Sequence, residues 1–264
     1  SRMKIRGRIV LLTCTICIVS VLVVSLVNYN LNAKKLLNEM ENNFKGVAEI
    51  TTKEMDQWLG IQKNSLKEIA AALEYNGNID FDYVHSYLEK QIKNNEGNVY
   101  YLGLPDGRAI FGIDYIPPAD FDSTTRVWYQ NALATDDVTV SSPYVDFRTG
   151  DVTITISKAI KKGGSLIGVI GSDIYINNLI EIISRLDLGE SSYGFLVDGD
   201  GNIVTHINEE FNPDSEKGHI NISEILDGKL IELFNAEGGE KNKNQIIDYD
   251  GMERFFFVEN MKIN

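Results

Sequence analysis

The chain has 264 residues, of which 43% are hydrophobic and 24% charged, so it is long enough for one or two folded domains and does not have a disordered composition. Its net charge of −13 argues against binding nucleic acid or anionic lipid headgroups through the general electrostatic field. Both cysteines, Cys14 and Cys17, lie near the N-terminus, so the remainder of the chain must be stable without disulfides.

The N-terminal region carries an uncharged apolar run from Ile9 to Val27, close to the ~20 residues that cross a bilayer as a helix. Basic residues precede it: Arg2, Lys4, Arg6 and Arg8. The positive-inside rule therefore predicts a cytoplasmic stub at 1–8, a transmembrane helix at 9–27 and an extracytoplasmic region from 28 to 264. A cleaved signal peptide is the alternative, but its apolar core is usually ~7–15 residues long and ends in a small-residue cleavage site, which is missing here. Within such a span, the two cysteines are interpreted as small apolar residues.

A long stalk helix is predicted from 28 to 75, because apolar residues recur there at intervals of mostly three or four. Asn76-Gly77-Asn78 ends it. A helix continuous with a membrane span links the two sides of the membrane mechanically. We expect a homodimer through this helix, although irregular heptad spacing limits any coiled coil. The apolar positions are Leu36, Met40, Phe44, Val47, Met55, Trp58, Leu66, Ile69 and Leu73.

Residues 76–175 have the pattern of an α+β unit, the membrane-distal one. A helix around Phe81–Ile92 comes first, and a short helix is compatible with Arg126–Ala134. Thr153, Thr155 and Ser157 alternate with Ile154, Ile156 and Lys158, the period of a sheet with one face towards solvent. Strands are predicted at 99–104, 108–111, 138–140, 144–147, 152–160 and 166–175.

Residues 176–264 repeat the pattern on a smaller scale, as a membrane-proximal unit. Helices are expected at 179–186, 222–226 and 229–236, and strands at 193–197, 202–205, 245–249 and 254–258. Because the repeat stops at Asn264 without a last strand, we expect the natural protein to continue. Asp198-x-Asp200-x-Asn202 with Glu209 resembles part of a calcium loop, but Ile203 replaces the required glycine, so a hairpin turn is favoured.

The segment from Phe121 to Asp173 collects one arginine, three aromatic residues and two carboxylates on short segments separated by strand-like sequence. Folded against one another, they would form an aromatic-walled pocket with a cationic and an anionic end. A free α-amino acid carries both complementary charges. The residues are Arg126, Trp128, Tyr129, Tyr144, Asp146 and Asp173.

These residues form the motifs R-x-W-Y, Y-x-D-x-x-T-G and G-x-x-G-x-D. With the apolar span, the long helix and the two α+β units, the chain resembles the double Cache (dCache_1) sensor domain. That domain is the extracytoplasmic ligand-binding region of bacterial chemoreceptors and related transmembrane sensors. The resemblance covers residues 28–264 and implies a PAS-like antiparallel sheet in each unit, a ligand in the distal one, and no cofactor.

The resemblance assigns the ligand carboxylate to Arg126 and Trp128, with Tyr129 adjoining. An arginine pairs bidentately with a carboxylate, in agreement with this role. The family usually has a tyrosine about five residues before the arginine, where this chain has Phe121, so one hydroxyl contact is missing.

The ligand ammonium is assigned in the same way to Tyr144, Asp146 and Asp173. Two carboxylates stay ionised when an ammonium lies between them, and their mutual repulsion raises one pKa when the site is empty. A ligand without an ammonium is rejected, because it leaves buried charge unpaired.

Each assignment has an alternative. Arg126 could pair with Asp122 at the surface, the aromatic residues could be core packing, and the two aspartates could serve local turns. The same sensor could instead bind an amine, a purine or an organic acid within a kinase or cyclase. A surface-anchored enzyme or adhesion module is a third interpretation, but no nucleophile–base motif or metal-ligand spacing of His85, His206 and His219 supports catalysis.

Overall fold

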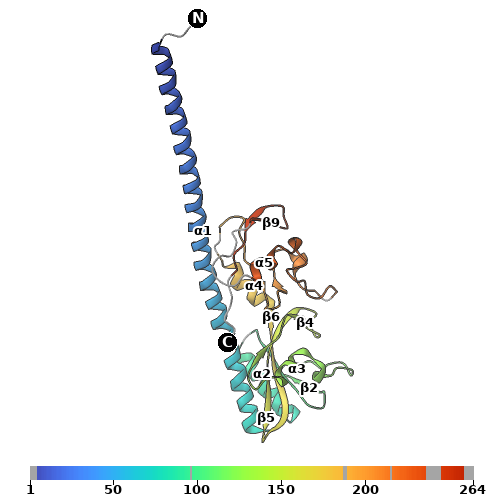
Figure 1. Ribbon diagram of the computed structural model, residues 1–264. Helices are drawn as coiled ribbons and strands as arrows, with labels where there is room; N and C mark the ends of the chain where they lie inside the picture. The colour runs from blue at the N-terminus through green and yellow to red at the C-terminus, as the bar shows by residue number, and fades with distance from the viewer. Residues whose placement is uncertain (1–4, 96, 187–188, 215, 236–244, 259–264) are drawn as a thin grey trace. The chain divides into compact units, whose positions relative to one another are not determined.

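The computed structural model describes residues 5–258 except 96, 187–188, 215 and 236–244. The chain forms two compact units, residues 1–48 and residues 49–264. The first helix, α1 (Ile5–Asn76), belongs to both (Figure 1). The chain has mixed helices and antiparallel sheets, so the predicted α+β class with a long N-terminal helix is confirmed. The domain boundaries proposed from the sequence at 8, 27, 75 and 175 stay predictions.

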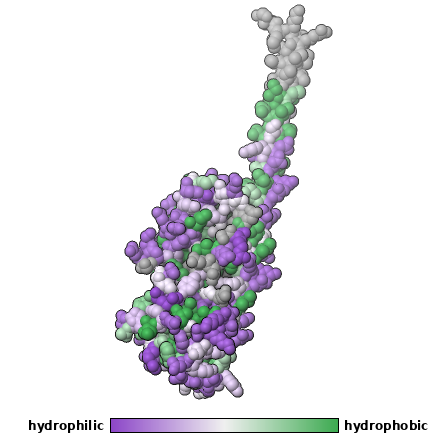
Figure 2. Space-filling view, turned by 180° about the vertical axis from the view of Figure 1, so that it is seen from behind, coloured by the Kyte–Doolittle hydropathy of each residue, from purple (hydrophilic) through white to green (hydrophobic). Residues whose placement is uncertain are grey.

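The first unit presents an apolar helix surface. Every large apolar side chain from Ile16 to Val27 is exposed, and Figure 2 shows apolar residues on the helix next to the grey atoms. The segment is long and apolar enough to cross a membrane. Its polar Ser20 donates a hydrogen bond to the Ile16 carbonyl within the helix (2.8 Å), which satisfies the hydroxyl without water.

A six-stranded antiparallel sheet forms the larger part of the second unit. Strands β1 and β6 pair at its centre, β2 flanks β1, and β5 flanks β6 and pairs with both β3 and β4. A long hairpin, with Gly163 and Gly164 at positive φ in its turn, joins β5 to β6. The strands are β1 (Val99–Gly103), β2 (Ala109–Phe111), β3 (Thr139–Val140), β4 (Tyr144–Val145), β5 (Val152–Lys162) and β6 (Ser165–Tyr175).

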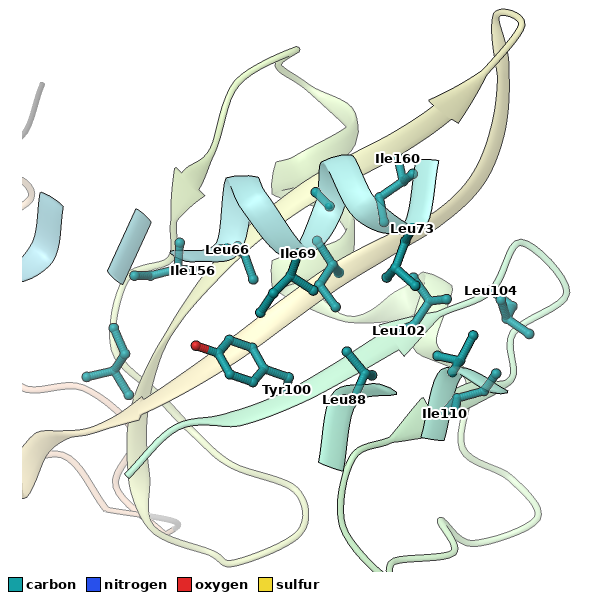
Figure 3. Packing of buried hydrophobic residues seen from close by; sticks show 14 of the residues in the cluster. Leu66, Ile69, Leu73, Leu88, Tyr100, Leu102, Leu104, Ile110, Ile156 and Ile160 are labelled. Atoms are coloured by element: carbon teal, nitrogen blue, oxygen red, sulfur yellow. The ribbon is translucent and has the colours of Figure 1, made fainter. Parts of the chain in front are cut away.

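One face of this sheet packs against the C-terminal part of α1 and against α2 (Phe81–Asn94) (Figure 3). Leu66, Ile69 and Leu73, spaced three and four residues apart on α1, are at most 3% exposed. They pack against Ile156 and Ile160 of β5 in one cluster. Fully burying a leucine or isoleucine contributes ~1.5–3 kcal/mol, so this stripe ties α1 to the sheet.

The other face of the sheet is covered by α3 (Val127–Leu133). A 3₁₀ turn, η1 (Ser123–Thr125), precedes α3, and Arg126 is the N-cap of the helix. The predicted short helix at Arg126–Ala134 therefore forms. Because α1 and α2 occupy the opposite face, residues of β1, β5 and β6 that point toward α3 form a separate cluster.

The proximal part of the second unit contains α4 (Ile176–Ser184), α5 (Leu230–Asn235) and two hairpins. The hairpins are β7 (Leu196–Val197) with β8 (Ile203–Thr205), and β9 (Gln245–Ile247) with β10 (Glu253–Phe255). Two further 3₁₀ turns are η2 (Glu209–Phe211) and η3 (Leu226–Gly228). Met55 of α1 packs with Leu179, Ile182 and Val204, so the same helix contacts both parts of the unit.

One predicted helix is wrong. Residues 222–226 form turns and the start of η3, and Leu226, Asp227 and Gly228 have positive φ. The side chain of Asn221 explains the difference, since its oxygen accepts from the Ser223 backbone N–H (3.0 Å) and hydroxyl (2.8 Å). These bonds favour a turn over a helix.

Candidate functional site

The strand register brings the site together on the α3 side of the sheet. Asp173 of β6 lies opposite Thr155 of β5 and Val99 of β1, and Gly171 lies opposite Tyr101. Directly paired residues, and residues two apart, share a face of a sheet. This arrangement places Asp173, Thr155 and Tyr101 side by side under α3.

The carboxyl group of Asp173 is buried, since the residue is 3% exposed, and one of its two oxygens accepts hydrogen bonds. Its Oδ1 accepts hydrogen bonds from the Tyr101 hydroxyl (2.6 Å) and the Thr155 hydroxyl (2.8 Å). Among the described residues, no hydrogen bond to Oδ2 is found. Burial raises the pKa of Asp173 to about 6, against the lowering effect of the Tyr101 hydrogen bond. Nearby Asp146 raises the pKa further.

Tyr144 takes part in the same network through Thr155. Their hydroxyls are 2.6 Å apart. A threonine hydroxyl has one proton, and Thr155 gives it to Asp173, so Tyr144 must donate to Thr155. Burial also raises the pKa of Tyr144, which keeps the phenol protonated. Every donor in this chain of hydrogen bonds therefore points toward the carboxyl of Asp173.

Arg126 is half-buried at the start of α3, and its guanidinium lies over two rings. The guanidinium carbon is 4.8 Å from the centre of Phe121 and 4.5 Å from that of Phe147. Its Nε is buried and has no hydrogen-bond partner among the described residues. Asp122 accepts through Oδ1 from the backbone N–H (2.9 Å) and hydroxyl (2.6 Å) of Thr124. These hydrogen bonds lower the pKa of Asp122, and the nearby charge of Arg126 lowers it further, without a direct ion pair in the described part of the chain. A buried charged donor without a partner is costly, so this guanidinium is suited to receive an anion.

Trp128 and Tyr129 are buried on α3, 4% and 2% exposed. The Trp128 ring packs edge-on against Tyr101 at 4.9 Å and against Tyr129 at 5.7 Å. Its carbonyl accepts a hydrogen bond from the Ser157 hydroxyl (2.7 Å), which fixes α3 to β5. Trp128 and Tyr129 are therefore core residues, and the Trp128 ring also lies beside Tyr101. Core packing and a place next to the proposed binding site are thus compatible roles for these residues.

Asp146 is buried, 8% exposed, and its carboxylate is used by its own turn. It accepts from the backbone N–H groups of Arg148 (3.2 Å) and Thr149 (3.1 Å) and from the Thr149 hydroxyl (2.9 Å). Gly150 closes the turn at positive φ. The hydrogen bonds of Asp146 therefore agree with the interpretation that it serves a local turn. Its negative charge also raises the pKa of Asp173.

Sequence reasoning missed Tyr101, Thr155, Arg148 and Tyr175. Arg148 donates a hydrogen bond to the Tyr175 hydroxyl, lies 3.8 Å from the Asp146 carboxylate and sits 6.0 Å from the ring centre of Tyr115. The alternation of β5 placed Thr155 on a sheet face, which was a usable signal. No sequence signal reveals the contact between Arg148 and Tyr175, because the two residues come from different segments.

The proximal part contains a second polar cluster, and its groups satisfy one another. His206 Nδ1 accepts from the Asn208 backbone N–H (2.9 Å), so its proton is on Nε2, 3.2 Å from the Tyr193 hydroxyl. That hydroxyl donates to Asp248 (2.7 Å), which also pairs with Arg254 (2.8 Å). Burial lowers the pKa of His206 to about 4. Among the described residues, the polar groups of this cluster bond mainly to one another, which stabilises the fold.

The suspected calcium loop is a hairpin turn, as expected. Asp198 accepts from the backbone N–H groups of Asp200 (3.0 Å) and Asn202 (2.8 Å) between β7 and β8. Within the described ranges, no group of three or more His, Cys, Asp or Glu side chains could hold a metal ion.

Two features of the main cluster therefore stand out chemically. In the part of the chain that the structure describes, the Nε of Arg126 has no hydrogen-bond partner and its guanidinium lies over Phe121, while the Asp173 carboxyl has an unused oxygen and is bonded to Tyr101. Phe121, Tyr101, Trp128 and Tyr144 belong to one hydrophobic cluster. The pair is complementary to a small molecule that carries both an anionic and a cationic group.

The chain is similar to several methyl-accepting chemotaxis proteins. It is 26% identical to PctB of Pseudomonas aeruginosa over 84% of the chain and 34% of that protein. It is 28% identical to McpC of Bacillus subtilis over 77% of the chain and 32% of that protein. The chain thus spans about a third of the length of these relatives.

Solved structures of ligand-binding domains are also similar. The domain of the Pseudomonas fluorescens chemoreceptor CtaA in complex with L-isoleucine is 26% identical, with a TM-score of 0.66 over 82% of this chain and 83% of that one. The domain of PctB in complex with L-Gln is 26% identical, with a TM-score of 0.60 over 69% and 72%. Among protein families, the Cache domain dCache_1 matches residues 30–263. This match confirms the resemblance seen in the sequence: the chain belongs to the dCache_1 family of Cache domains.

Proposed function

We propose that this chain is the extracytoplasmic sensor region of a bacterial transmembrane chemoreceptor, and that it binds a free amino acid on the α3 side of its larger sheet. The observation that carries the proposal is the buried, unpartnered Nε of Arg126 together with the carboxyl of Asp173, of which Oδ1 alone accepts hydrogen bonds, next to one aromatic cluster. The similar CtaA and PctB domains, which have been solved with amino acids, support it.

In this proposal, Arg126 binds the ligand carboxylate, and Trp128 and Tyr129 wall that end of the site. Phe121 supplies a ring against the guanidinium, 4.8 Å away, in place of the hydroxyl usual in the family. A guanidinium that stacks on aromatic rings keeps its N–H groups in its own plane, free of the ring faces. The stacking therefore orients the N–H groups of Arg126 for a planar anion.

At the other end, Asp173 receives the ammonium through Oδ2. Tyr144 acts through Thr155, and Asp146 adds negative charge. An ammonium next to Asp173 favours its ionised form, which opposes the effect of burial. Binding and ionisation of this carboxyl are therefore linked.

The proposed role is that of a receptor and not of an enzyme. Occupancy would reach the membrane through α1, because the sheet that carries the site packs on that helix. A ligand drives such a change only through its difference in affinity for the two states. Pairing of two copies through α1 belongs to the same proposal, as does residence in the bacterial cell membrane with residues 28–264 outside the cytoplasm.

Calorimetry tests the assignment on the whole chain in lipid nanodiscs. We expect one or more of the twenty amino acids to bind, and Arg126→Ala and Asp173→Asn each to weaken binding at least about hundredfold, or ~2.7 kcal/mol. Arg108→Ala is the matched control, since Arg108 pairs with Asp106 at the surface. The amine and the carboxylic acid that correspond to each ligand should not bind. An amine that binds equally well with and without Arg126 would show that the ligand class is different.

A further inference from the structure

The loop after β4 supplies a second cation to the site. Asp146 fixes this loop by accepting from the backbone of Arg148 and Thr149, and the Gly150 backbone N–H donates to the Asp146 carbonyl (2.8 Å). The loop therefore presents two consecutive side chains in defined directions. Phe147 lies against Arg126, and Arg148 reaches the Tyr175 hydroxyl.

Arg148 lies at the anionic end of the site. Its side chain is only 20% exposed and is 3.8 Å from the Asp146 carboxylate. Its partner Tyr175 is two residues from Asp173 on β6, so both side chains are on the same face. The charge of Arg148 also lowers the pKa of Asp173, which places the guanidinium within electrostatic reach of that carboxyl.

The charges that act on Asp173 are those of Asp146 and Arg148, whereas half-buried Asp122 acts on Arg126 and exposed Asp151 acts on Tyr175. At the anionic end, Arg148 and a ligand ammonium provide two positive charges against the two negative charges of Asp146 and ionised Asp173. A zwitterion with a neutral side chain leaves this balance intact. A ligand with a cationic side chain adds a positive charge in a partly buried region that already holds two guanidinium groups, and uncompensated buried charge is costly.

We propose that Arg148 is a specificity-determining residue that excludes amino acids with cationic side chains, so that the site selects net-neutral zwitterions. This inference rests on the proposed function, because it concerns the side-chain preference of the same site. Arg148 is already bonded to Tyr175 and close to Asp146, so its effect on the ligand side chain is one of charge and not of a required hydrogen bond.

The test compares L-lysine with L-norleucine, whose side chain has a similar length and no charge, by calorimetry on the whole chain in nanodiscs. The unaltered protein should bind norleucine at least about tenfold more tightly than lysine, or ~1.4 kcal/mol. Arg148→Gln should reduce this ratio about tenfold, and Arg148→Glu should invert it. Arg148→Lys, which keeps the charge, should retain the preference. Arg185→Gln, at exposed ion pairs with Glu54 and Glu181, should leave the ratio unchanged.

The outcomes separate the two proposals. If the unaltered protein binds no amino acid, the proposed function fails and this inference fails with it. If it binds norleucine but the ratio is the same in Arg148→Gln and Arg148→Glu, only the role of Arg148 is refuted. Loss of the preference in Arg148→Lys would also refute it, since the charge would then not be the cause. Thermal melts of each variant identify any that do not fold, and Arg148→Lys keeps the test valid if Arg148→Gln is one of them.

Discussion

The buried charge of Asp173 should destabilise the folded domain, so replacing Asp173 by a neutral residue should stabilise the domain in the absence of ligand. Asp173→Asn retains the side-chain shape and keeps an oxygen to accept from Tyr101 and Thr155, whereas it removes the buried charge. The same change should abolish amino-acid binding, because a neutral amide does not compensate a ligand ammonium.

The magnitude follows from the pKa. Burial raises the pKa of Asp173 from 3.8 to about 6. Between these values the folded state binds more protons than the unfolded state, so the free energy of unfolding falls as the pH rises from about 4 to about 6. A shift of roughly two units corresponds to ~3 kcal/mol at pH 7. Below pH 4 the carboxyl is neutral in both states, and the effect disappears.

Thermal or urea unfolding at several pH values, without ligand, measures this difference. The stability gain of Asp173→Asn should be near zero at pH 4 and grow to roughly 3 kcal/mol at pH 7. Asp120→Asn, an exposed control, should show no such growth. A variant that is less stable than the original at pH 7, or a difference that does not depend on pH, would refute the reasoning. Added amino acid should raise the melting temperature of the original protein only.

Three further substitutions test the packing around the site and the two ends of the fold. Gly171→Ala would place a Cβ 2.5 Å from the Tyr101 ring, so it should displace that ring and weaken ligand affinity in calorimetry more than tenfold, ~1.4 kcal/mol. Lys162→Ala removes an ammonium that donates to the last carbonyls of α1, so about 0.3–1 kcal/mol of stability should be lost and amide exchange there should quicken. Arg254→Ala leaves the buried Asp248 carboxylate without its guanidinium, and urea unfolding should show a loss of roughly 3–5 kcal/mol in the proximal part.

Local patterns in the sequence predicted much of the sheet. The alternation of Thr153, Thr155 and Ser157 located β5, and its register with β6 brought Thr155 beside Asp173. Arg126 was expected to begin a short helix and does so. Period-two patterns and turn residues act over a few neighbours, so they are visible without knowledge of tertiary contacts.

Long-range contacts explain what the sequence did not show. Tyr101 has the pattern of a core strand residue, and only the pairing of β1 with β6 places its hydroxyl on Asp173. Arg148 resembles an ordinary loop residue until its turn brings it to Tyr175. The segment 222–226 has helical periodicity, but Asn221 side-chain bonds determine its conformation instead.

Strand β6 connects the proposed binding site with α1, the helix that carries the candidate membrane span. Side chains alternate across a strand, so Asp173 faces α3 while its neighbours Ser172 and Ile174 face the opposite side. Ile174 and Ile170 belong to the same cluster as Leu66 and other residues of α1. Any backbone movement of β6 that accommodates an ammonium at Asp173 must therefore move side chains packed on α1. Close packing makes such interfaces respond to small shifts, since a core has few voids to absorb them. In the proposed receptor, Asp173 and Ile174 are neighbours on opposite faces of β6, so substitutions at Ile170 or Ile174 should impair signalling more than ligand binding.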